Sequence, residues 1–176
     1  DVFVATGGRQ PNRLFVNDGQ GTFTKVEAGA LVADPSNSWG AASADVDDDG
    51  DLDLYVSNTG RAFANFFFRN DTPAGNHWLK LRLAGTRSNR AGIGANVRVR
   101  AKIGGRTVWQ QRAVSAQDTF NGHNAFDVHF GLGDAARVER VEVAWPSGLV
   151  DVFEGVAADQ TLTVREGAAP GGKAAG

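Results

Sequence analysis

The stretch DVDDDGDLDLYVSN, residues 45–58, places six aspartates within nine positions and then alternates between apolar and polar residues. The acidic part follows the spacing D-x-D-x-D-G-x-x-D, in which Asp45, Asp47, Asp49 and Asp53 surround Gly50. The alternation that follows is typical of a strand with one apolar face. The sequence therefore predicts a tight acidic loop that leads directly into a β-strand.

An all-oxygen set of this kind suits a hard cation, because calcium takes six to eight oxygen ligands at about 2.3–2.6 Å. Four aspartates would supply side-chain oxygens, and Asp51 would supply its backbone carbonyl at position 7. Gly50 provides the backbone freedom that a loop needs to wrap an ion. We expect the calcium ligands to be Asp45, Asp47, Asp49, Asp51 and Asp53.

The acidic pattern has two other interpretations. An EF-hand requires Glu at position 12, where Val56 stands, and helices on both sides. A solvated acidic turn would leave clustered carboxylates that repel one another, and the nearest basic residue along the chain, Arg61, lies eight residues past Asp53. The spacing favours a calcium loop between two strands, with a structural ion rather than one that bridges to a ligand.

The composition sets outer limits on fold and function. The chain has 176 residues, of which 41% are hydrophobic and 22% charged, which suits one or two globular domains. It contains no cysteine, which excludes disulfides and thiolate metal sites, and no apolar run long enough to predict a membrane span. The acidic balance and the lack of a recognition motif argue against a nucleic-acid partner.

Charge is divided unevenly along the chain. Residues 1–75 carry 11 acidic and 5 basic side chains, a net charge of −6, whereas residues 76–176 carry 9 acidic and 13 basic ones, a net charge of +4. Such asymmetry indicates two modules with different surroundings.

Short alternating runs rich in Val, Phe, Leu and Ile recur along the chain and are separated by Gly, Asn and Asp, which is typical of antiparallel β structure. We therefore expect an all-β protein. The clearest predicted strands are Leu79–Leu83, Asn96–Ile103, Ala125–Phe130, Val138–Trp145 and Thr161–Val164.

The first part of the chain contains an internal repeat with a period of about 52 residues, in the range typical of propellers and repeat arrays. Residues 1–18 align with residues 51–71 when Asp1 is set on Asp53 and one residue is inserted. The matched positions are then Asn12 with Asn65, Leu14 and Phe15 with Phe67 and Phe68, and Asn17-Asp18 with Asn70-Asp71. This alignment leads us to expect that the chain starts within a repeat.

The pattern changes at TPAGNHW, residues 72–78, where a Pro-Gly segment ends the repetitive part. We expect a repeat region at residues 1–75 and a second β domain at residues 76–166. The remainder, GAAPGGKAAG at residues 167–176, has the composition of a flexible tail.

Two known families are recognisable in these segments. NRLFVNDGQGTF and WGAASADVDDDGDLDLYVSN, residues 12–23 and 39–58, resemble the FG-GAP/VCBS repeat, the blade of integrin-α-like β-propellers, whose acidic loop binds calcium. NHWLKLRLAGTRSNRAGIGANVRV, HFGLG and WPSG, which begin at residues 76, 129 and 145, resemble the ASPIC/UnbV domain of cartilage-acidic-protein-like (CRTAC-like) secreted proteins.

These resemblances imply a partial β-propeller with a calcium loop, followed by an antiparallel β-sandwich-like domain. They also imply a secreted, periplasmic or cell-surface location. One segment departs from the ASPIC/UnbV pattern: residues 115–128 read SAQDTFNGHNAFDV, so no role can be transferred to that loop.

In the second domain, NVRVRAK places Arg98, Arg100 and Lys102 on one face of a strand and apolar residues on the other. A solvated sheet face is favoured over an anion-binding face for these cations. If an anion binds there, a sulfated or acidic polysaccharide is the better candidate.

No reactive centre is predicted. Asp127 and His129 share a strand face and are interpreted as a surface pair rather than a catalytic dyad. The histidines lack metal-ligand spacing, and no nucleophile motif is present, so we expect no enzymatic activity. Trp78, Trp109 and Trp145 are expected to pack in the core or between sheets.

The sequence thus favours a non-catalytic, calcium-binding scaffold of the extracellular or cell surface that binds or adheres to an extracellular protein or a glycan. One alternative is a structural protein that self-associates through open strand edges into oligomers or fibres. Another is a carbohydrate-binding accessory module of a larger enzyme.

Overall fold

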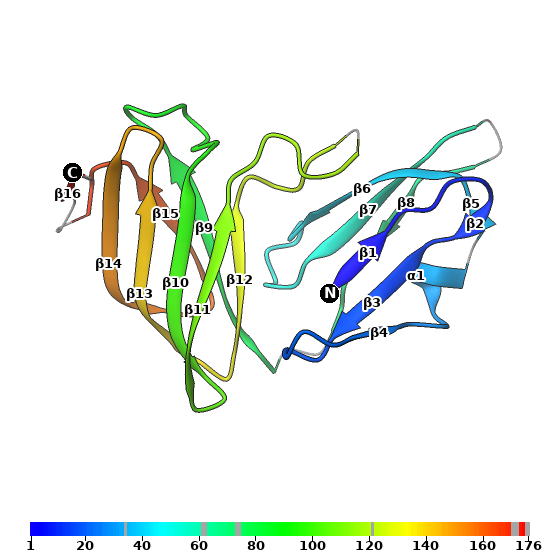
Figure 1. Ribbon diagram of the computed structural model, residues 1–176, viewed down its shortest axis with the longest axis horizontal. Coiled ribbons are helices and arrows are strands. Elements are labelled where there is room, and N and C mark those ends of the chain that lie inside the picture. Colours follow the sequence, from blue (N-terminus) through cyan, green and yellow to red (C-terminus); the bar gives the residue numbers. More distant parts are fainter. Residues whose placement is uncertain (34, 61–62, 73–74, 121, 170–172, 175–176) are drawn as a thin grey trace. The chain divides into compact units, whose positions relative to one another are not determined.

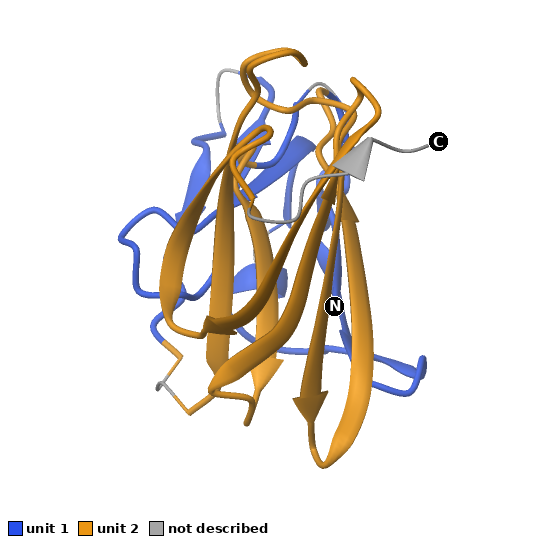
Figure 2. Ribbon diagram, turned by 90° about the vertical axis from the view of Figure 1, so that its left-hand side faces the viewer, with its two compact units in different colours: residues 1–71, 117–124 blue, residues 72–116, 125–176 orange. Residues whose placement is uncertain are grey.

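The regular secondary structure of the described residues consists almost entirely of β-strands (Figure 1), and the all-β fold class is confirmed. A computed structural model describes residues 1–33, 35–60, 63–72, 75–120, 122–169 and 173–174. The chain divides into two compact units, which Figure 2 colours separately. Unit 1 comprises residues 1–71 and 117–124, and unit 2 comprises residues 72–116 and 125–176. A segment from the middle of the second predicted domain therefore belongs to unit 1.

The described residues of unit 1 form two three-stranded sheets and one two-stranded ribbon, all antiparallel. The first sheet has the order β1-β3-β4, with β1 at Val2–Val4, β3 at Arg13–Asn17 and β4 at Phe23–Lys25. The second has the order β6-β7-β8, with β6 at Ser38–Ala44, β7 at Asp53–Asn58 and β8 at Phe66–Phe68. The ribbon pairs β2 (Gln10–Pro11) with β5 (Pro35–Ser36), and α1 (Ala30–Ala33) is a single helical turn.

The strand pairing confirms the internal repeat residue by residue. The antiparallel pairs of β1 with β3 are Val2–Phe15, Phe3–Leu14 and Val4–Arg13, and those of β7 with β8 are Leu54–Phe68, Tyr55–Phe67 and Val56–Phe66. Each pair in the first sheet is the aligned counterpart of one in the second. The β1–β3 pair and the β7–β8 pair are therefore the same structural unit made twice, whereas the third strands of the two sheets, β4 and β6, lie on opposite sides of that pair.

Hydrogen bonds repeat along with the register. The backbone N–H of Asn17 donates to Asp1 Oδ1, and that of Asn70 donates to Asp53 Oδ1, both over 2.8 Å. A second equivalent pair is made by the Oδ1 atoms of Asn12 and Asn65, which accept from the N–H groups of Thr6 and Asn58, both over 2.9 Å. The aligned asparagines and aspartates thus serve to close the same loops in both copies.

Unit 2 consists of two sheets. The larger sheet has the order β11-β10-β13-β14-β16, formed by Arg106–Ala113, Asn96–Ile103, Arg137–Ala144, Leu149–Ala157 and Lys173–Ala174. The smaller sheet has the order β12-β9-β15, formed by Val128–Gly133, His77–Ala84 and Gln160–Arg165.

Two details of unit 2 differ from the sequence-based expectation. The predicted strand at Ala125–Phe130 begins only at Val128, because residues 125–127 lie in the preceding loop. The sheets are also not purely antiparallel, since β15 pairs with β9 in parallel. Parallel pairing needs a long connection, and the chain between these strands passes through five others. Alternation in the sequence predicts a strand, but it carries no information about the direction of its neighbour.

The hydrophobic core of unit 2 lies between its two sheets, and both contribute side chains to one cluster. The alternation predicted for β10 is confirmed, because Val97, Val99 and Ala101 are buried. Phe130 from β12 is fully buried in the same cluster. Each buried Val or Phe side chain of this cluster contributes about 1.5–3 kcal/mol of burial free energy, so the core makes a large contribution to the stability of the unit.

Two buried acidic side chains hold the loops around this core. Asp151 is fully buried and accepts hydrogen bonds from Trp145 Nε1 at 2.8 Å and from the backbone N–H groups of Gly167 and Ala169. Residues 167–169, which the sequence assigns to a flexible tail, are thus tied to β14.

Within the described residues, no helix has the length and apolar character that a membrane crossing requires.

Glu166, only 4% exposed, organises the loop that follows β9. Its Oε2 accepts the successive backbone N–H groups of Thr86, Arg87 and Ser88 at 2.6–2.7 Å, and its Oε1 accepts hydroxyl groups of Ser88 and Ser147. Burial by itself raises the pKa of Glu166, but these donors outweigh it and hold the pKa far below the ordinary value for glutamate. The carboxylate is thus ionised and fully bonded.

This carboxylate makes stability depend on pH. A group whose pKa is lowered by folding stabilises the protein above its unfolded-state pKa, about 4.3 for glutamate, and loses that contribution as the pH falls below it. We expect Glu166→Gln to destabilise unit 2 by about 2–3 kcal/mol at pH 7. The NH₂ group of the new amide would face backbone N–H and hydroxyl donors, and it cannot accept their hydrogen bonds. Urea unfolding should show this difference beginning to shrink as the pH falls below about 4.3 and reduced only in part at pH 3, because the folded-state pKa lies far below that of the unfolded chain.

Glu139→Gln is the matched control, because this exposed glutamate pairs with Arg100 at the surface and should cost about 1 kcal/mol or less. A difference between Glu166→Gln and the original protein that stays constant down to pH 3 would contradict the assigned charge state.

Candidate metal centre

The acidic loop lies between two adjacent strands, as predicted. β6 ends at Ala44 and β7 begins at Asp53, and these two residues form the last pair of the hairpin. Within the turn, Asp48 and Gly50 have φ angles of 60° and 97°, in the left-handed region. Gly50 adopts this conformation at little cost, and aspartate is among the residues that tolerate it. The loop therefore coils tightly and gathers its side chains.

Three of the five predicted ligands come together. Asp45, Asp47 and Asp49 each place one carboxylate oxygen within 4.8 Å of the other two. Oxygens bound to a single calcium ion at about 2.3–2.6 Å lie at most about 5 Å apart, so this cluster has the dimensions of one coordination shell. Asp45 Oδ2 also accepts the backbone N–H of Gly50 at 3.3 Å, and its Oδ1 is shielded from solvent.

The other two predicted ligands are not part of this carboxylate cluster, and Asp51 is expected to contribute its backbone carbonyl rather than its side chain. Asp51 donates its backbone N–H to Asp49 Oδ1 at 2.9 Å. Asp53 is 2% exposed, and its two oxygens accept the N–H groups of Val46 and Asn70 at 2.9 and 2.8 Å. Its first role is therefore to close the loop, although each carboxylate oxygen has lone pairs for a further partner. Metal contacts from Asp51 and Asp53 stay predictions.

The charges in the loop are only partly compensated. Partial loss of solvent and the negative charges of Asp49 and Asp53 raise the pKa of Asp47. Arg69, just after β8, opposes this from 3.8 Å, and it also pairs with Asp71 at 2.6 Å. Sequence reasoning missed Arg69 because it is distant along the chain and reaches the loop only through the pairing of β7 with β8. Arg61, the basic residue nearest in sequence, lies outside the described residues.

The potential ligand atoms of this loop are of the chemical type that binds a hard cation. Hard oxygen ligands are preferred by calcium, and the donor set here consists of carboxylates with further backbone carbonyls in the turn. The raised pKa of Asp47 indicates that its negative charge is disfavoured by its neighbours, which a bound cation would relieve. An ion held by Asp45, Asp47 and Asp49 would supply positive charge that fixes the turn.

Comparison with protein families identifies both parts of the chain. An FG-GAP-like repeat matches residues 1–56, and the ASPIC and UnbV family matches residues 85–171. The chain carries an FG-GAP-like repeat followed by an ASPIC/UnbV domain. The two domain assignments made from the sequence are thus confirmed, and domains of these types suggest an extracellular-type adhesion or scaffold module. No curated protein compared with the chain matches it.

The acidic loop falls inside the FG-GAP-like repeat, whereas the divergent loop of the ASPIC/UnbV domain returns to unit 1. Asn124 Oδ1 accepts both the backbone N–H and the hydroxyl of Ser43, at 2.8 and 3.0 Å. Asp118 in turn holds the backbone and side-chain nitrogens of Asn124. Through Asn124, the segment 117–124 thereby binds the backbone N–H of Ser43 on the edge strand β6. Ser43 lies two residues before Asp45.

The same segment forms an exposed aromatic pair. Phe120 lies 5.9 Å from Trp39 between ring centroids at an angle of 44°, and the two side chains are 63% and 50% exposed. The carbonyl oxygen of Phe120 lies so close to Gly40 that a Cβ there would be 2.8 Å away. Glycine is therefore required at position 40 for this close approach. No signal in the sequence links these segments, which are about 80 residues apart.

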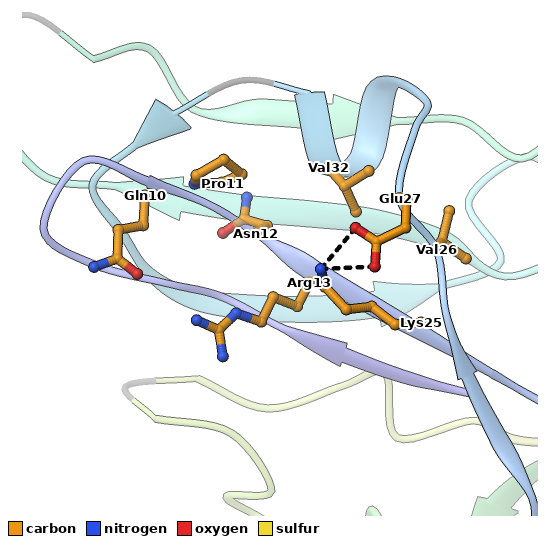
Figure 3. A pocket seen from close by; sticks show the side chains of 8 residues that line it. All are labelled: Gln10, Pro11, Asn12, Arg13, Lys25, Val26, Glu27 and Val32. Atoms are coloured by element: carbon orange, nitrogen blue, oxygen red, sulfur yellow. Dashed lines mark hydrogen bonds and ion pairs between the residues drawn. The ribbon is translucent and has the colours of Figure 1, made fainter.

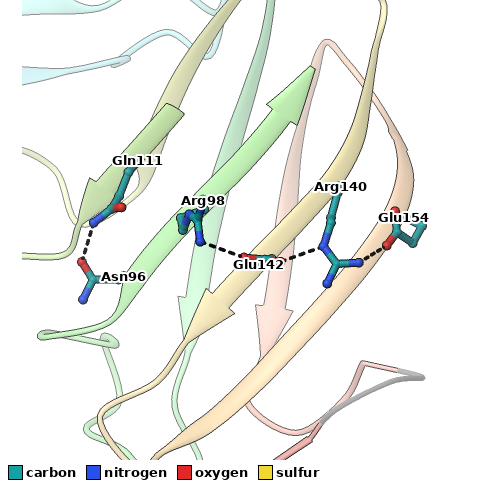
Figure 4. A network of polar contacts seen from close by, with 6 residues as sticks. All are labelled: Asn96, Arg98, Gln111, Arg140, Glu142 and Glu154. Atoms are coloured by element: carbon teal, nitrogen blue, oxygen red, sulfur yellow. Dashed lines mark hydrogen bonds and ion pairs between the residues drawn. The ribbon is translucent and has the colours of Figure 1, made fainter. Parts of the chain in front are cut away.

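The predicted basic face of the ASPIC/UnbV domain is an alternating ladder of charges (Figure 4). Arg98 contacts Glu142 at 3.5 Å, Arg140 contacts Glu142 at 2.7 Å, and Arg140 also binds Glu154. Arg100 similarly pairs with Glu139 at 2.9 Å. These glutamates neutralise charge that an anion would need, which supports the solvated face. Anion binding by Arg98, Arg100 and Lys102 stays a prediction.

Of the three tryptophans expected in the core, Trp109 is not there. It is 41% exposed, and the guanidinium groups of Arg98 and Arg100 lie 4.5 and 5.6 Å from its ring centroid. These cation–π contacts let a large aromatic side chain remain on a polar face. Trp145 is buried as expected, and Trp78 is half-buried and stacks on His129.

The Asp127–His129 pair and one cleft of unit 1 are the remaining candidates for a reactive site. Asp127 binds Arg82 through two hydrogen-bonded nitrogens, and His129 stacks on Trp78. A cleft of about 300 Å³ in the FG-GAP-like region contains the Lys25–Glu27 ion pair, 2.8 Å long (Figure 3). Its lining includes no histidine, serine or cysteine, and its ionisable side chains are those of Arg13, Lys25 and Glu27.

The role of Asp53 can be separated from metal binding. In calcium-free buffer with EDTA, Asp53→Ala should destabilise unit 1 by about 2–3 kcal/mol, because two backbone N–H groups lose their acceptor in a mostly buried position. The equivalent substitution in the other repeat copy, Asp1→Ala, is the matched control. Asp1 is exposed and should cost about 1 kcal/mol or less. Equal losses in urea unfolding would show that Asp53 has no special structural role.

Proposed function

We propose that the chain is a non-catalytic, calcium-stabilised scaffold that binds a partner at the cell surface or outside the cell. The observation that carries this proposal is the clustering of the Asp45, Asp47 and Asp49 oxygens within 4.8 Å in a loop of the D-x-D-x-D-G-x-x-D type. Calcium bound there would rigidify the hairpin of β6 and β7 and so present its surface in one conformation.

The calcium assignment also supports an extracellular, periplasmic or cell-surface location. Weak calcium sites of the extracellular type have dissociation constants of about 10⁻⁴–10⁻³ M, and such sites fill only where calcium is abundant. The match to an FG-GAP-like repeat followed by an ASPIC/UnbV domain agrees with this, as does the resemblance to CRTAC-like secreted proteins. The proposed partner is an extracellular protein or a glycan.

Calcium should raise the melting temperature of the protein. At a calcium concentration 100 times the dissociation constant, linkage adds about 2.7 kcal/mol, which corresponds to a shift of several degrees. Asp47→Asn should abolish the shift because it removes one charged ligand of the cluster. Differential scanning calorimetry in calcium and in EDTA measures this effect, and isothermal titration calorimetry measures binding directly.

Asp48→Asn is the matched control, since Asp48 lies in the same loop but between the spaced ligand positions. Asp48→Asn removes one negative charge from the loop, as Asp47→Asn does. It should leave most of the calcium-dependent rise in melting temperature. The calcium site would be refuted by identical melting curves in calcium and EDTA. An equal loss of response in both variants would point to general charge screening instead.

A glycan is favoured as partner class by one specific observation, the exposed pair of Trp39 and Phe120. Aromatic rings held open to solvent provide flat apolar surfaces against which the C–H faces of a sugar ring can pack. The carbohydrate-binding module considered from the sequence therefore gains a candidate surface, in unit 1 rather than on the tryptophans of the second domain.

Substitution of Trp39 by Ala should reduce glycan binding at least about tenfold, equivalent to 1.4 kcal/mol of lost contact, and Phe120→Ala should act in the same direction. Trp109→Ala serves as a control because this partly exposed tryptophan lies in unit 2. A glycan array on which the original protein binds nothing would eliminate the glycan and leave a protein as the partner class.

A further inference from the structure

One end of unit 2 is formed by three segments that are bonded to one another (Figure 1). They are the β9–β10 connection at residues 85–95, the β13–β14 turn at residues 145–148, and residues 166–169 after β15. Glu166 joins all three, because its carboxylate accepts N–H groups of the first segment and the hydroxyl of Ser147 in the second. Ser147 also donates its N–H to Ser88 Oγ at 3.2 Å. We call these segments together the Glu166 end of unit 2.

The β9–β10 connection is held in shape by further hydrogen bonds. Asn89 accepts the backbone N–H of Ile93 through Oδ1 at 2.8 Å and donates through Nδ2 to the carbonyl of Ile93 at 2.7 Å. The N–H of Gly85 donates to the carbonyl of Arg90 at 3.1 Å. A loop that is already ordered loses little conformational freedom when a ligand binds, which lowers the free-energy cost of binding.

Three exposed arginines belong to this end of the unit. Arg87 and Arg90 lie three residues apart in the β9–β10 connection, and Arg165 is the last residue of β15, directly before Glu166. The backbone N–H of Arg87 donates to Glu166 Oε2 at 2.6 Å, which keeps these two parts of the chain adjacent. Within the part of the chain that the structure describes, no acidic side chain forms an ion pair with Arg87, Arg90 or Arg165.

The net charge of the Glu166 end is positive. Its three segments contain a single acidic residue, Glu166 itself. That carboxylate is buried and already accepts five hydrogen bonds from backbone N–H and hydroxyl groups. The three positive charges of Arg87, Arg90 and Arg165 against this one negative charge leave a net formal charge of +2. The exposed charges at this end are therefore all positive.

The basic sheet face predicted from the sequence differs in this respect. There Arg98 and Arg140 share Glu142, as Figure 4 shows, and Arg100 pairs with Glu139. An anion that binds to the sheet face must compete with these carboxylates for the guanidinium groups. At the Glu166 end it meets no such competitor among the described residues. The loop end is therefore the better place for an anion.

We propose that the Glu166 end of unit 2 binds an acidic polysaccharide, with Arg87 and Arg90 as the main contacts and Arg165 beside them. Guanidinium groups bind sulfate and carboxylate groups through paired, charge-assisted hydrogen bonds. A polymer that repeats such groups can engage several arginines at once, which strengthens binding beyond that of one contact.

This inference rests on the proposed function, because it gives the glycan partner of the scaffold an acidic character and a further contact surface. A polysaccharide is favoured over an acidic protein by the exposed aromatic pair of Trp39 and Phe120, which suits sugar rings.

Isothermal titration calorimetry on the complete chain tests the proposal with four probes: heparin, polygalacturonate, neutral dextran and poly-L-glutamate. The original protein should bind heparin or polygalacturonate, and the affinity should fall at high salt because salt screens exposed charges. The double variant Arg87→Gln/Arg90→Gln should bind at least about tenfold more weakly. Both side chains are exposed and the N–H of Arg87 remains, so circular dichroism should show unchanged folding.

Arg98→Gln/Lys102→Gln is the matched control, since it removes the same two positive charges from exposed positions on the sheet face of the same unit. It should keep most of the affinity for the acidic polymer. An equal loss of affinity in both double variants would show a general attraction to positive charge and would overturn the assignment to the Glu166 end. So would a loss confined to the control.

The outcomes also separate this inference from the proposed glycan surface at Trp39. Binding of dextran without binding of either acidic polysaccharide would overturn the inference and leave that surface standing. Binding of an acidic polysaccharide that Trp39→Ala leaves unchanged, but that Arg87→Gln/Arg90→Gln removes, would support the inference and refute the surface at Trp39. Poly-L-glutamate bound as tightly as the polysaccharides would make an acidic protein the partner and overturn the inference, as would the absence of binding to any probe.

Discussion

Three buried carboxylates, Asp53, Asp151 and Glu166, hold the loops of this protein in place. A charged oxygen removed from water must receive hydrogen bonds, and the nearest donors are backbone N–H groups that would otherwise also be left without acceptors. Asp53 joins the acidic loop to the strand pair that follows it. Glu166 gathers three successive N–H groups of one loop, and Asp151 fastens the segment after β15.

This constraint gives the acidic loop its shape before any metal is considered. Because Asp53 is committed to closing the hairpin, the neighbouring carboxylates of Asp45, Asp47 and Asp49 remain gathered at the turn. Their mutual repulsion is the cost of that arrangement, and Arg69 offsets only part of it. A loop of this kind is well suited to a cation that stabilises a fixed binding surface. Unit 2, in contrast, is held by a large apolar core between two sheets.

Much of the architecture could be predicted from the sequence. The alternation of β10, the calcium-type loop between two strands and the repeat with its single inserted residue all depend on local patterns, and the structure contains each of them. The candidate site was predicted less completely. Spacing along the chain identified five aspartates, but it could not show that Asp53 bonds to Val46 and Asn70 or that Arg69 approaches the loop.

The sequence by itself determined the strands, the repeat and the position of the acidic turn, because side-chain periodicity and glycine placement act over a few residues. Only the tertiary structure decided which elements meet. It paired β15 with β9 in parallel, brought Asn124 and Phe120 to β6, kept Trp109 on a polar face beneath two arginines, and covered Val56 while leaving Val4 exposed. These outcomes depend on contacts between residues far apart in the chain, and equivalent residues in a repeat receive different neighbours. Local sequence patterns do not specify those neighbours.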